Sequence, residues 1–512
     1  MAKKPSRNAK GSHIVIIGGG IGGMATAALL GKAGYKVSLY EKNDRLGGKA
    51  GLYKKDGFVF DMGPSWYLMP DVFEHYFKLM GEDISDHIKL KPLDPSYRIF
   101  FKDTGLTVDV TGDIERDLKI FEEIEPGVTP RFMEYLKKSE EQYKIAMGSF
   151  VYKNYDTVKD FFTLEALLKG TKLRVFSKMH GYVKRYFQTP EMQKIMEYNL
   201  VFLGSSPYNT PALYSIMAHI DFNLGVFYPE GGIYRIVEVL KDLMDKHGVT
   251  VVTGAPTEQI VVENGKAVGV LLESGEVVDV DVVVSNADRH HTETSLTPAE
   301  YRTIPDEKWE KATLAPSAYI MYLGIKGKIP QLTHHNLVFS EDWEANFAEI
   351  FGENKRLPTD PSYYVCAPSV TDADVAPKGY ENLFVLVPIP AGVDESKVWM
   401  EVYGDTILNN MEHTMEIPDL RKRVVQKRVY SIDQFKADYN SFQGTALGLA
   451  HTLNQTAIFR PNNTNKKIEN LFYVGADTNP GIGMPMCLIS AELLLKRLRK
   501  DKSAAPLAEP LS

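Results

Sequence analysis

The chain has 512 residues, of which 44% are hydrophobic and 24% charged, and it carries a formal net charge of −7. This length predicts about two to four globular domains. The acidic balance argues against a nucleic-acid binder. Only two cysteines, Cys366 and Cys487, are present, which excludes a disulfide framework and favours a reducing cytosol. No stretch approaches the roughly 18 consecutive apolar residues of a transmembrane helix, so any membrane contact would be peripheral.

The first predicted elements are a strand, a helix and a second strand within residues 14–41. The opening run IVII is typical of a strand buried on both faces of a parallel sheet. Gly18, Gly20 and Gly23 follow it with the spacing GxGxxG and open a helix of small residues. A second apolar strand ends at Glu41. This order is the βαβ fingerprint of dinucleotide binding.

Each part of this unit has a role in holding a dinucleotide. Gly18 makes the turn from strand to helix, Gly20 lets the backbone approach a pyrophosphate, and Gly23 lets the helix pack close to the strand. The diphosphate would lie at the helix N-terminus, where unpaired N–H groups favour negative charge. The carboxylate of Glu41 can accept hydrogen bonds from a ribose hydroxyl but would repel a 2′-phosphate. The unit therefore favours FAD or NAD over NADP.

Two glycine-containing motifs follow. Arg45, Gly48 and Lys49 belong to the run RLGGK, which suggests a second contact with the diphosphate or the ribityl chain. A glycine turn with solvated charges would read the same. Further on, the run FDMGPS places Gly63 and Pro64 in a turn that says little by itself.

The pattern changes after about residue 96. Paired strands over residues 97–110 and helices over 113–125 and 130–143 indicate a second domain. Residues 208–226 are apolar and aromatic, and they either fill a core or line an apolar cavity. We interpret His219 in this stretch as a packed histidine, because no second His or Cys stands at metal-ligand spacing.

One stretch of this second domain is basic. Between residues 166 and 190 there are six Lys or Arg and no Asp or Glu. On a helical wheel of residues 170–187, the basic side contains Arg174, Lys178 and Arg185. The apolar side consists of Phe176, Met179, Val183 and Phe187. A basic amphipathic helix can lie flat on an anionic bilayer, although an ordinary helix with its apolar face in the core fits the pattern too.

The second half returns to strand patterns. Asn264-Gly265 and Ser274-Gly275 separate alternating apolar runs and predict hairpins. The last of these strands ends in Asn286-Ala287-Asp288, which leads back to the nucleotide domain. Residues 296–460 predict a mixed sheet with a helix and belong to the second domain.

The closing motif, in residues 470–485, is a strand followed by a loop with three glycines and two prolines. An amphipathic helix is predicted over residues 486–500. A helix N-terminus behind a glycine-rich loop is a second anion site. If it points at the N1–C2=O edge of a flavin, its dipole stabilises the reduced, anionic flavin.

Taken together, the motifs resemble those of the bacterial and fungal type of phytoene desaturase, within the flavoprotein amine oxidase-like superfamily, over nearly the whole chain. They are GxGxxG with Glu41, RLGGK, FDMGP, YPEGG at residues 228–232, Asn286-Ala287-Asp288, and the closing motif. The first is shared by many flavoproteins, whereas the closing motif together with FDMGP and YPEGG is much more specific.

The resemblance implies an α/β fold, in which a Rossmann-like FAD-binding domain assembled from discontinuous segments joins an α+β substrate domain with a mixed sheet. The implied FAD-binding segments are residues 12–95, 227–295 and 461–500. The implied substrate domain consists of residues 96–226, which would also face the membrane, and residues 296–460. Residues 501–512 are expected to be a disordered tail.

The resemblance also implies a site for non-covalently bound FAD. The ADP half would be held by Gly18, Gly20, Ile21, Gly23, Glu41 and Lys42, with Val252 presenting backbone to the adenine. Arg45, Gly48, Lys49 and Asp477 would lie along the diphosphate and ribityl chain. Gly63, Pro64 and Ser65 would face the isoalloxazine, and Gly483, Met484 and Met486 would cap it. Two residues depart from the family pattern: Lys49 stands where arginine is common, and Asp477 stands where many members have glycine.

The implied reaction removes two hydrogens from adjacent carbons of an acyclic carotenoid such as phytoene, one as hydride to flavin and one as a proton. Glu230 in YPEGG is the one candidate base, although a turn residue would explain it as well. No metal site is expected. A quinone or O2 would reoxidise the flavin. The enzyme would work in the cytoplasm, peripherally associated with the inner face of the cell membrane, and it could form a homo-oligomer there.

Other readings remain open. The substrate could be diapophytoene (C30) or a hydroxylated carotenoid desaturated at the 3,4 bond, since the motifs are shared. An amine oxidase of the same superfamily and a non-catalytic flavin-binding or chaperone-like protein are the alternatives from other classes.

Overall fold

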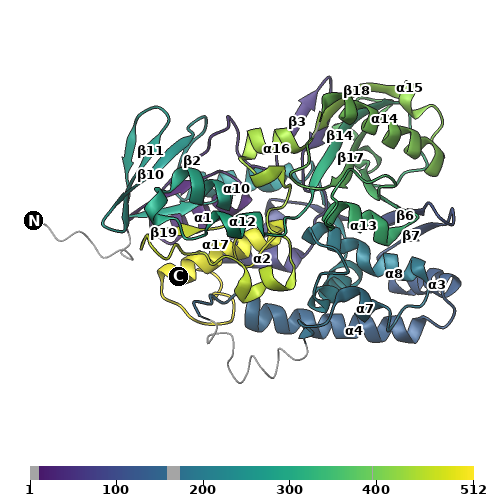
Figure 1. The fold of residues 1–512 in the computed structure, drawn as a ribbon, viewed down its shortest axis with the longest axis horizontal. Coiled ribbons are helices and arrows are strands. Elements are labelled where there is room, and N and C mark those ends of the chain that lie inside the picture. Colours follow the sequence, from purple (N-terminus) through teal and green to yellow (C-terminus); the bar gives the residue numbers. More distant parts are fainter. Residues whose placement is uncertain (1–10, 158–172, 395, 512) are drawn as a thin grey trace, which may run out of the picture.

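Residues 11–157, 173–394 and 396–511 are described in a computed structural model of the chain (Figure 1). A five-stranded sheet with its helices occupies the left of the view. A larger sheet lies at the upper right, and a group of helices lies below it.

The five-stranded sheet is parallel and is assembled from segments far apart in the sequence. Its order is β19-β13-β1-β2-β9. These strands are β1 (His13–Ile17), β2 (Lys36–Tyr40), β9 (Thr250–Val252), β13 (Val282–Ser285) and β19 (Leu471–Tyr473). The predicted Rossmann-like sheet built from discontinuous segments is confirmed.

Both faces of this sheet are covered, as its unbroken apolar strands require. Ile14 and Ile16 belong to a core that also contains side chains of four helices. These helices are α1 (Ile21–Lys32), α2 (Pro70–Leu79), α10 (Tyr234–Lys246) and α17 (Met484–Leu498). Val15 and Ile17 belong to the core on the opposite face. There the cover is the antiparallel sheet of β10 (Thr257–Glu263), β11 (Lys266–Leu272) and β12 (Val277–Asp279).

The second domain is built on a seven-stranded sheet of order β18-β14-β17-β16-β15-β6-β7. Its strands are β6 (Tyr97–Phe101), β7 (Thr107–Val110), β14 (Ser317–Lys326), β15 (His335–Phe339), β16 (Tyr363–Cys366), β17 (Tyr380–Ile389) and β18 (Val424–Tyr430). The β15–β6 pair is parallel and the other pairs are antiparallel. The predicted mixed sheet is therefore confirmed.

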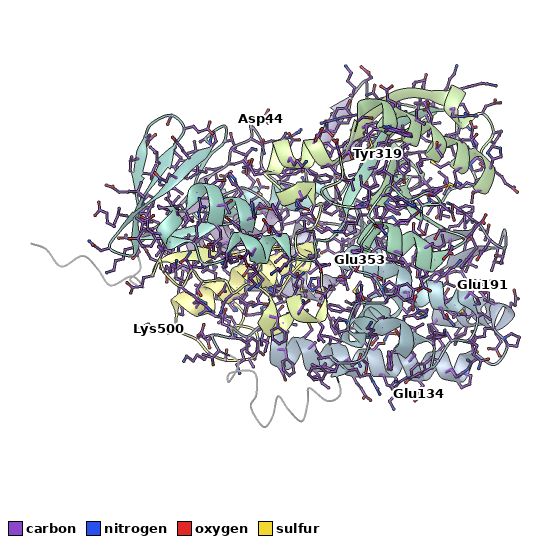
Figure 2. All side chains as sticks on the ribbon, in the orientation of Figure 1. Asp44, Glu134, Glu191, Tyr319, Glu353 and Lys500 are labelled. Carbon is purple, nitrogen blue, oxygen red and sulfur yellow. The ribbon has the colours of Figure 1, made fainter. Side chains whose placement is uncertain are left out.

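The two faces of this sheet pack against different hydrophobic cores. Tyr319 and Met321 pack in a core with residues of α14 (Lys397–Thr414). Ile320 and Tyr322 point the other way, into an aromatic core shared with the helices at the lower right. Figure 2 labels Tyr319 on the large sheet and Glu134 on α4 at the far edge of the helical group. The aromatic core lies between sheet and helices.

The remaining elements connect these units. The helices are α3 (Ile114–Ile124), α4 (Thr129–Ala146), α7 (Met179–Val183), α8 (Pro190–Glu197), α9 (Ile216–His219), α11 (Arg289–His291), α12 (Asp306–Glu310), α13 (Trp343–Phe351), α15 (Leu420–Arg423) and α16 (Ile432–Tyr439). The strands are β3 (Leu52–Lys55) paired with β4 (Phe58–Asp61), and β5 (Leu90–Pro92) paired with β8 (Phe227–Pro229). Three π-helical turns, Met147–Val151, Ile220–Leu224 and Thr292–Leu296, extend α4, α9 and α11 in the described part of the chain.

The basic stretch departs from the predicted single helix over residues 170–187. Residues 170–172 lie outside the described part, and from residue 173 the chain forms turns that lead into the short α7. Long-range contacts override the helical pattern, because Lys178 forms a β-bridge with Pro211 and the N–H of Met179 donates to Thr210 O. The predicted apolar face is divided: Phe176 is 88% exposed, while Met179, Val183 and Phe187 are buried.

The tail is ordered in residues 501–511, where we expected disorder. The N–H of Leu511 donates to Leu79 O of α2. The ammonium group of Lys496 on α17 donates to Ser503 O and Ala505 O. The tail carbonyls thus satisfy the hydrogen-bond donors of a buried lysine. The composition of the tail does not indicate this contact.

Within the described residues, the structure has no helix that is both long and apolar enough to cross a membrane.

Candidate functional site

The loop between β1 and α1 leaves room only for backbone. A Cβ on Gly23 would lie 2.1 Å from Gly18 O, and a Cβ on Gly22 would lie 2.6 Å from Asn286 Oδ1. Gly18 has φ = 97°, which favours glycine. Asn286 follows β13 at the same edge of the sheet. The glycines therefore form a cradle at the N-terminus of α1, where Ile21 is the first helical residue.

Glu41 lies beside this cradle at the end of β2. Its side chain is 5% exposed, and the Gly19 N–H donates to Oε2 at 2.6 Å. The Asn43 N–H donates to Oε1 at 2.8 Å. The N–H of Glu41 donates to Val252 O of β9 at 2.9 Å. This places Glu41 and Val252 together, next to the loop that is predicted to hold the pyrophosphate.

The RLGGK and FDMGPS motifs meet the same loop. The Gly47 N–H donates to Gly19 O at 2.8 Å, and a Cβ on Gly48 would lie 3.0 Å from Gly20 Cα. A Cβ on Gly63 would lie 2.2 Å from Lys49 O. These close approaches bring segments that are predicted to contact diphosphate, ribityl chain and isoalloxazine into one region.

Two predicted contact residues point elsewhere. The exposed guanidinium of Arg45 donates to Leu52 O. The ammonium group of Lys42 donates to Ala437 O of α16. Their predicted contacts with FAD stay predictions.

A buried charge cluster joins Lys49 to the closing loop. Burial lowers the pKa of Lys49, while the charges of Asp477 and Asp288 raise it. Burial, followed by the charge of Asp477, raises the pKa of Asp288 to about 7. The Asp288 carboxylate accepts the N–H groups of His291 and Phe442. The Arg289 N–H donates to Asp477 Oδ2 at 3.3 Å.

Gly483 precedes α17 with φ = 118°, and Met484 is the first residue of that helix. Met484 is buried and Met486 is half-buried. The N-termini of α1 and α17 are thus both available at glycine-rich loops, and α1 packs against α17.

Arg460 and His451 support this closing loop, and neither belongs to a sequence motif. The buried Arg460 guanidinium donates to Ala476 O and Thr478 O. The Ile482 N–H donates to His451 Nε2, and His451 Nδ1 is hydrogen-bonded to the Tyr214 hydroxyl. No local motif marks either residue, because their partners are distant in sequence or are backbone groups.

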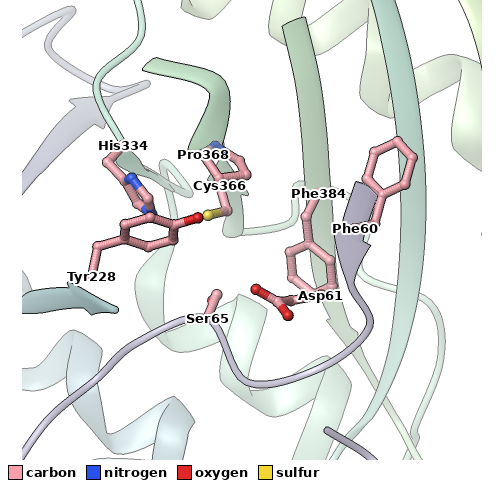
Figure 3. A pocket seen from close by; sticks show the side chains of 8 residues that line it. All are labelled: Phe60, Asp61, Ser65, Tyr228, His334, Cys366, Pro368 and Phe384. Carbon is pink, nitrogen blue, oxygen red and sulfur yellow. The ribbon is translucent and has the colours of Figure 1, made fainter. Parts of the chain in front are cut away.

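A cavity of about 20 Å³, room for about one water, lies next to the FDMGPS loop (Figure 3). Its lining comprises Phe60, Asp61, Ser65, Tyr228, His334, Cys366, Pro368 and Phe384. Asp61 accepts the N–H groups of Ile233 and Tyr234 at the start of α10. Burial raises the pKa of Asp61 to about 6. Ser65 is hydrogen-bonded to the Tyr364 hydroxyl, which also bonds His335 Nδ1.

Two imidazoles and a thiol lie together behind this loop. Side-chain nitrogens of His334 and His335 and the sulfur of Cys366 lie within 4.8 Å of one another. Burial lowers the pKa of His334 to about 3 and holds the pKa of His335 well below its usual value, whereas burial raises the pKa of Cys366 to about 12. We expected no metal site, and metal analysis of the purified protein would show whether this group binds one.

Glu230 lies at the surface. Its side chain is 44% exposed and lies 3.5 Å from Lys91 Nζ. Its predicted role as a base stays a prediction, as do the cofactor contacts of the other predicted residues.

The donor set fits FAD. Glycines leave space for a diphosphate at two helix N-termini, and a buried carboxylate stands where a ribose is expected. The loop of Gly63, Pro64 and Ser65 joins this cradle to the aromatic core. FAD would therefore extend from the sheet edge towards the second domain.

Comparison with known proteins agrees with this geometry. The family described as flavin containing amine oxidoreductase matches residues 21–493. A carotenoid 3,4-desaturase of Haloarcula japonica is 46% identical over 494 residues, which covers 96% of this chain and 99% of that protein. A zeta-carotene-forming phytoene desaturase of Myxococcus xanthus is 36% identical, with 96% and 95% covered. A 4,4'-diapophytoene desaturase of Staphylococcus aureus is 32% identical, with 95% and 99% covered.

Among solved structures, wild-type putrescine oxidase bound to putrescine aligns with a TM-score of 0.62 at 14% identity, covering 96% of this chain and 99% of that one. A fatty acid isomerase from P. acnes aligns with a TM-score of 0.57 at 15% identity, covering 95% and 99%. These two likenesses show a shared fold.

Proposed function

This chain belongs to the flavin containing amine oxidoreductases and, among them, to the carotenoid desaturases, and we propose that it desaturates the 3,4 bond of an acyclic carotenoid. It is an FAD-dependent oxidoreductase that acts on CH–CH bonds. The observation that carries the 3,4 assignment is the 46% identity to a carotenoid 3,4-desaturase, against 36% and 32% for the two phytoene-type relatives. Phytoene, the substrate that the motifs of the sequence imply, is the second candidate.

The aromatic core suits such a substrate. Trp66 follows the FDMGPS loop directly and packs with Tyr97, Tyr198 and His335. A long apolar polyene that enters this core would be shielded from water and held against the flavin. When bound, FAD supplies the acceptor for a hydride. The residues of this chain orient the substrate and keep the site dry.

Pigment analysis tests this proposal. The chain is expressed in bacteria that accumulate an acyclic carotenoid with saturated 3,4 bonds, and in separate strains that make phytoene or diapophytoene. We expect one added conjugated double bond at the 3,4 position in the first strain, seen by chromatography and a shift of absorption to longer wavelength. Conversion of phytoene alone would favour the second candidate. Unchanged pigments in all strains, with FAD bound to the purified protein, would refute carotenoid desaturation.

We further propose that the enzyme binds the inner face of the cell membrane from the cytoplasm. The exposed ring of Phe176 lies in a segment with the exposed basic residues Lys178, Lys184 and Arg185. An apolar anchor with basic neighbours is suited to an anionic lipid surface.

A membrane quinone or O2 would then reoxidise the flavin, and the enzyme could assemble as a homo-oligomer there. Anaerobic turnover with added quinone distinguishes the two acceptors.

A further inference from the structure

We propose that the carboxylate of Asp221, held by Tyr97 and Tyr198, is the base that takes the proton during desaturation. The proposal rests on the proposed function of the enzyme. It adds a catalytic residue that no sequence motif indicates.

The position of Asp221 follows from the segment that carries it. Asp221 lies in the π-helical turn Ile220–Leu224, and such turns often occur at functional sites. Seven residues earlier, Tyr214 contacts the closing loop through His451. The two tyrosines bound to Asp221 pack against Trp66, which follows Ser65. Asp221 is thus linked to the FDMGPS loop through the two tyrosines and Trp66, and the same stretch of chain is linked to the closing loop through Tyr214 and His451.

The surroundings of Asp221 are aromatic. The hydroxyls of Tyr97 and Tyr198 both donate to Asp221 Oδ2, at 2.7 and 2.9 Å. The Trp66 ring lies with its centroid 5.5 Å from that of Tyr97 and 4.1 Å from that of His335. Electron-rich ring faces and a buried carboxylate are suited to a delocalised carbocation.

Asp221 differs from the other buried acids in the described part of the chain. Five of those acids face a cationic or ionisable partner: Glu125 pairs with Arg131, Glu197 with His180, Glu293 with Arg289, Glu381 with Lys328, and Glu492 with His75. Glu41 and Asp117 accept backbone N–H groups. Among the described residues, no cationic side chain forms an ion pair with Asp221, which is 6% exposed.

This environment makes Asp221 able to exchange a proton near neutral pH. Burial raises its pKa to about 7, the hydrogen bonds from Tyr97 and Tyr198 lower it, and the charge of Asp117 on α3 raises it. A base is most effective when its pKa lies near the working pH. By contrast, both oxygens of Asp61 are occupied by backbone N–H groups at the start of α10.

The step balances as follows. FAD, when bound, would supply the two-electron acceptor for the hydride that leaves one carbon of the substrate when its C–H bond breaks. The adjacent carbon loses a proton to the Asp221 carboxylate, and the electrons of that C–H bond form the new C=C bond. Asp221 then returns the proton to solvent. The tyrosines position the carboxylate and tune its basicity.

The pH dependence of desaturation tests the proposal in the FAD-bound enzyme. The wild-type rate should rise with pH through an inflection near 7, because the base must be ionised. Asp221→Asn should lower the rate about 100-fold or more and remove this inflection. If Asp221→Asn keeps both the rate and the inflection, or if Glu230→Gln removes the inflection instead, the proposal is wrong.

Three tuning variants keep the test decisive if Asp221→Asn fails to fold. Tyr97→Phe and Tyr198→Phe each remove a hydrogen bond to the carboxylate, so each should raise the inflection by up to about one pH unit. Asp117→Asn removes a like charge and should lower it. If the role of Asp221 is purely structural, the three variants should not shift the inflection of the pH–rate profile in these directions.

A substrate-free readout separates this proposal from the proposed function. Subtracting the infrared pH titration of FAD-bound Asp221→Asn from that of FAD-bound wild type should leave a protonated carboxyl band that titrates near pH 7, because the bands of Asp61 and Asp288 are common to both proteins and cancel. If wild type desaturates no carotenoid in the pigment test, the proposed function fails, and with it this catalytic role, even where the band is present. If wild type desaturates a carotenoid and the band is missing, only the assignment of Asp221 fails.

Discussion

At Gly23 a single methyl group decides whether the cradle can form. A Cβ there would lie 2.1 Å from Gly18 O, which is a backbone atom that cannot move aside cheaply. We expect Gly23→Ala to destabilise the protein by about 1–3 kcal/mol and to abolish FAD binding, as measured by flavin absorbance of the purified protein. Gly181→Ala is the matched control, because a Cβ on Gly181 meets no atom within 4 Å. Normal flavin content in Gly23→Ala would contradict the geometry.

The raised pKa of Asp61 predicts that the stability of the folded protein depends on pH. This pKa is raised by burial from 3.8 to about 6 in the folded protein. A raised pKa favours the protonated form, so this contribution is fully present below about pH 3.8 and is lost as the pH rises through 6. The unfolding free energy of wild type relative to Asp61→Asn should therefore fall by about 3 kcal/mol between pH 4 and pH 7. Chemical unfolding of both proteins across this range measures the difference, and a constant difference would count against the raised pKa.

At the scale of elements, Arg460 fixes the loop that leads into α17. Its buried guanidinium donates to carbonyl groups of Ala476 and Thr478. Arg460→Leu leaves these carbonyls unpaired, so we expect a lower melting temperature and at least tenfold weaker retention of FAD on dilution, roughly the effect of losing 1.4 kcal/mol. The control is Arg421→Leu, which removes an arginine whose side chain is 51% exposed. Equal retention in both variants would show that the loop does not depend on Arg460.

The C-terminal tail should respond to pH through His75. Burial lowers the pKa of His75, but hydrogen bonds and charges of Glu492 and Glu509 outweigh it and raise the pKa overall. Because the pKa is raised, the stabilisation is fully present below pH 6.5 and is lost as the pH rises through the folded value. Hydrogen exchange at Leu507 and Leu511, corrected for the intrinsic rate, should be faster at pH 8.5 than at pH 6.

His75→Gln removes the ionisable group and should remove this pH dependence of exchange. Retained dependence in the variant would assign the effect to another residue.

The sequence predicted elements best where a pattern is local. The run IVII, GxGxxG and the turns at Asn264-Gly265 and Ser274-Gly275 coincide with β1, α1 and the hairpins of β10 to β12. The basic stretch was predicted as one helix and is not, because contacts with Thr210 and Pro211 end the pattern. Contacts between residues that are distant in the sequence leave no local pattern from which they could be predicted.

Residues of the candidate site, too, could be predicted only where they belong to a local motif. The glycine cradle, Glu41 and the closing loop could be found from their motifs. Arg460, His451 and Asp221 could not, because tertiary contacts bring their partners to them: Tyr97 lies 124 residues before Asp221. The signal available for Asp288 was its position after a strand that ends at the nucleotide edge of the sheet.

At the scale of the whole molecule, α7, which the residues of the proposed membrane surface flank, lies at the lower right of Figure 1, whereas the nucleotide sheet lies at the left. Phe176→Asp should weaken binding to vesicles of phosphatidylglycerol and phosphatidylcholine about tenfold, because an exposed ring can no longer enter the bilayer. Val277→Asp is the control, since Val277 is 54% exposed on β12 at the other end. Vesicle flotation measures both. Equal binding of the two variants would refute this surface.

The strand order of the nucleotide sheet also has a consequence for how the protein is made. Its first strand is synthesised near the start, but β19 and α17 emerge from the ribosome only after the whole second domain. A nascent chain must therefore hold an open cradle while the domain inserted between its parts folds, and long-range pairing of this kind is slow. FAD would therefore bind only to chains that have been translated at least as far as α17. Shortage of flavin during growth would leave finished chains with an unfilled sheet edge, exposed to the proteases that remove incomplete proteins.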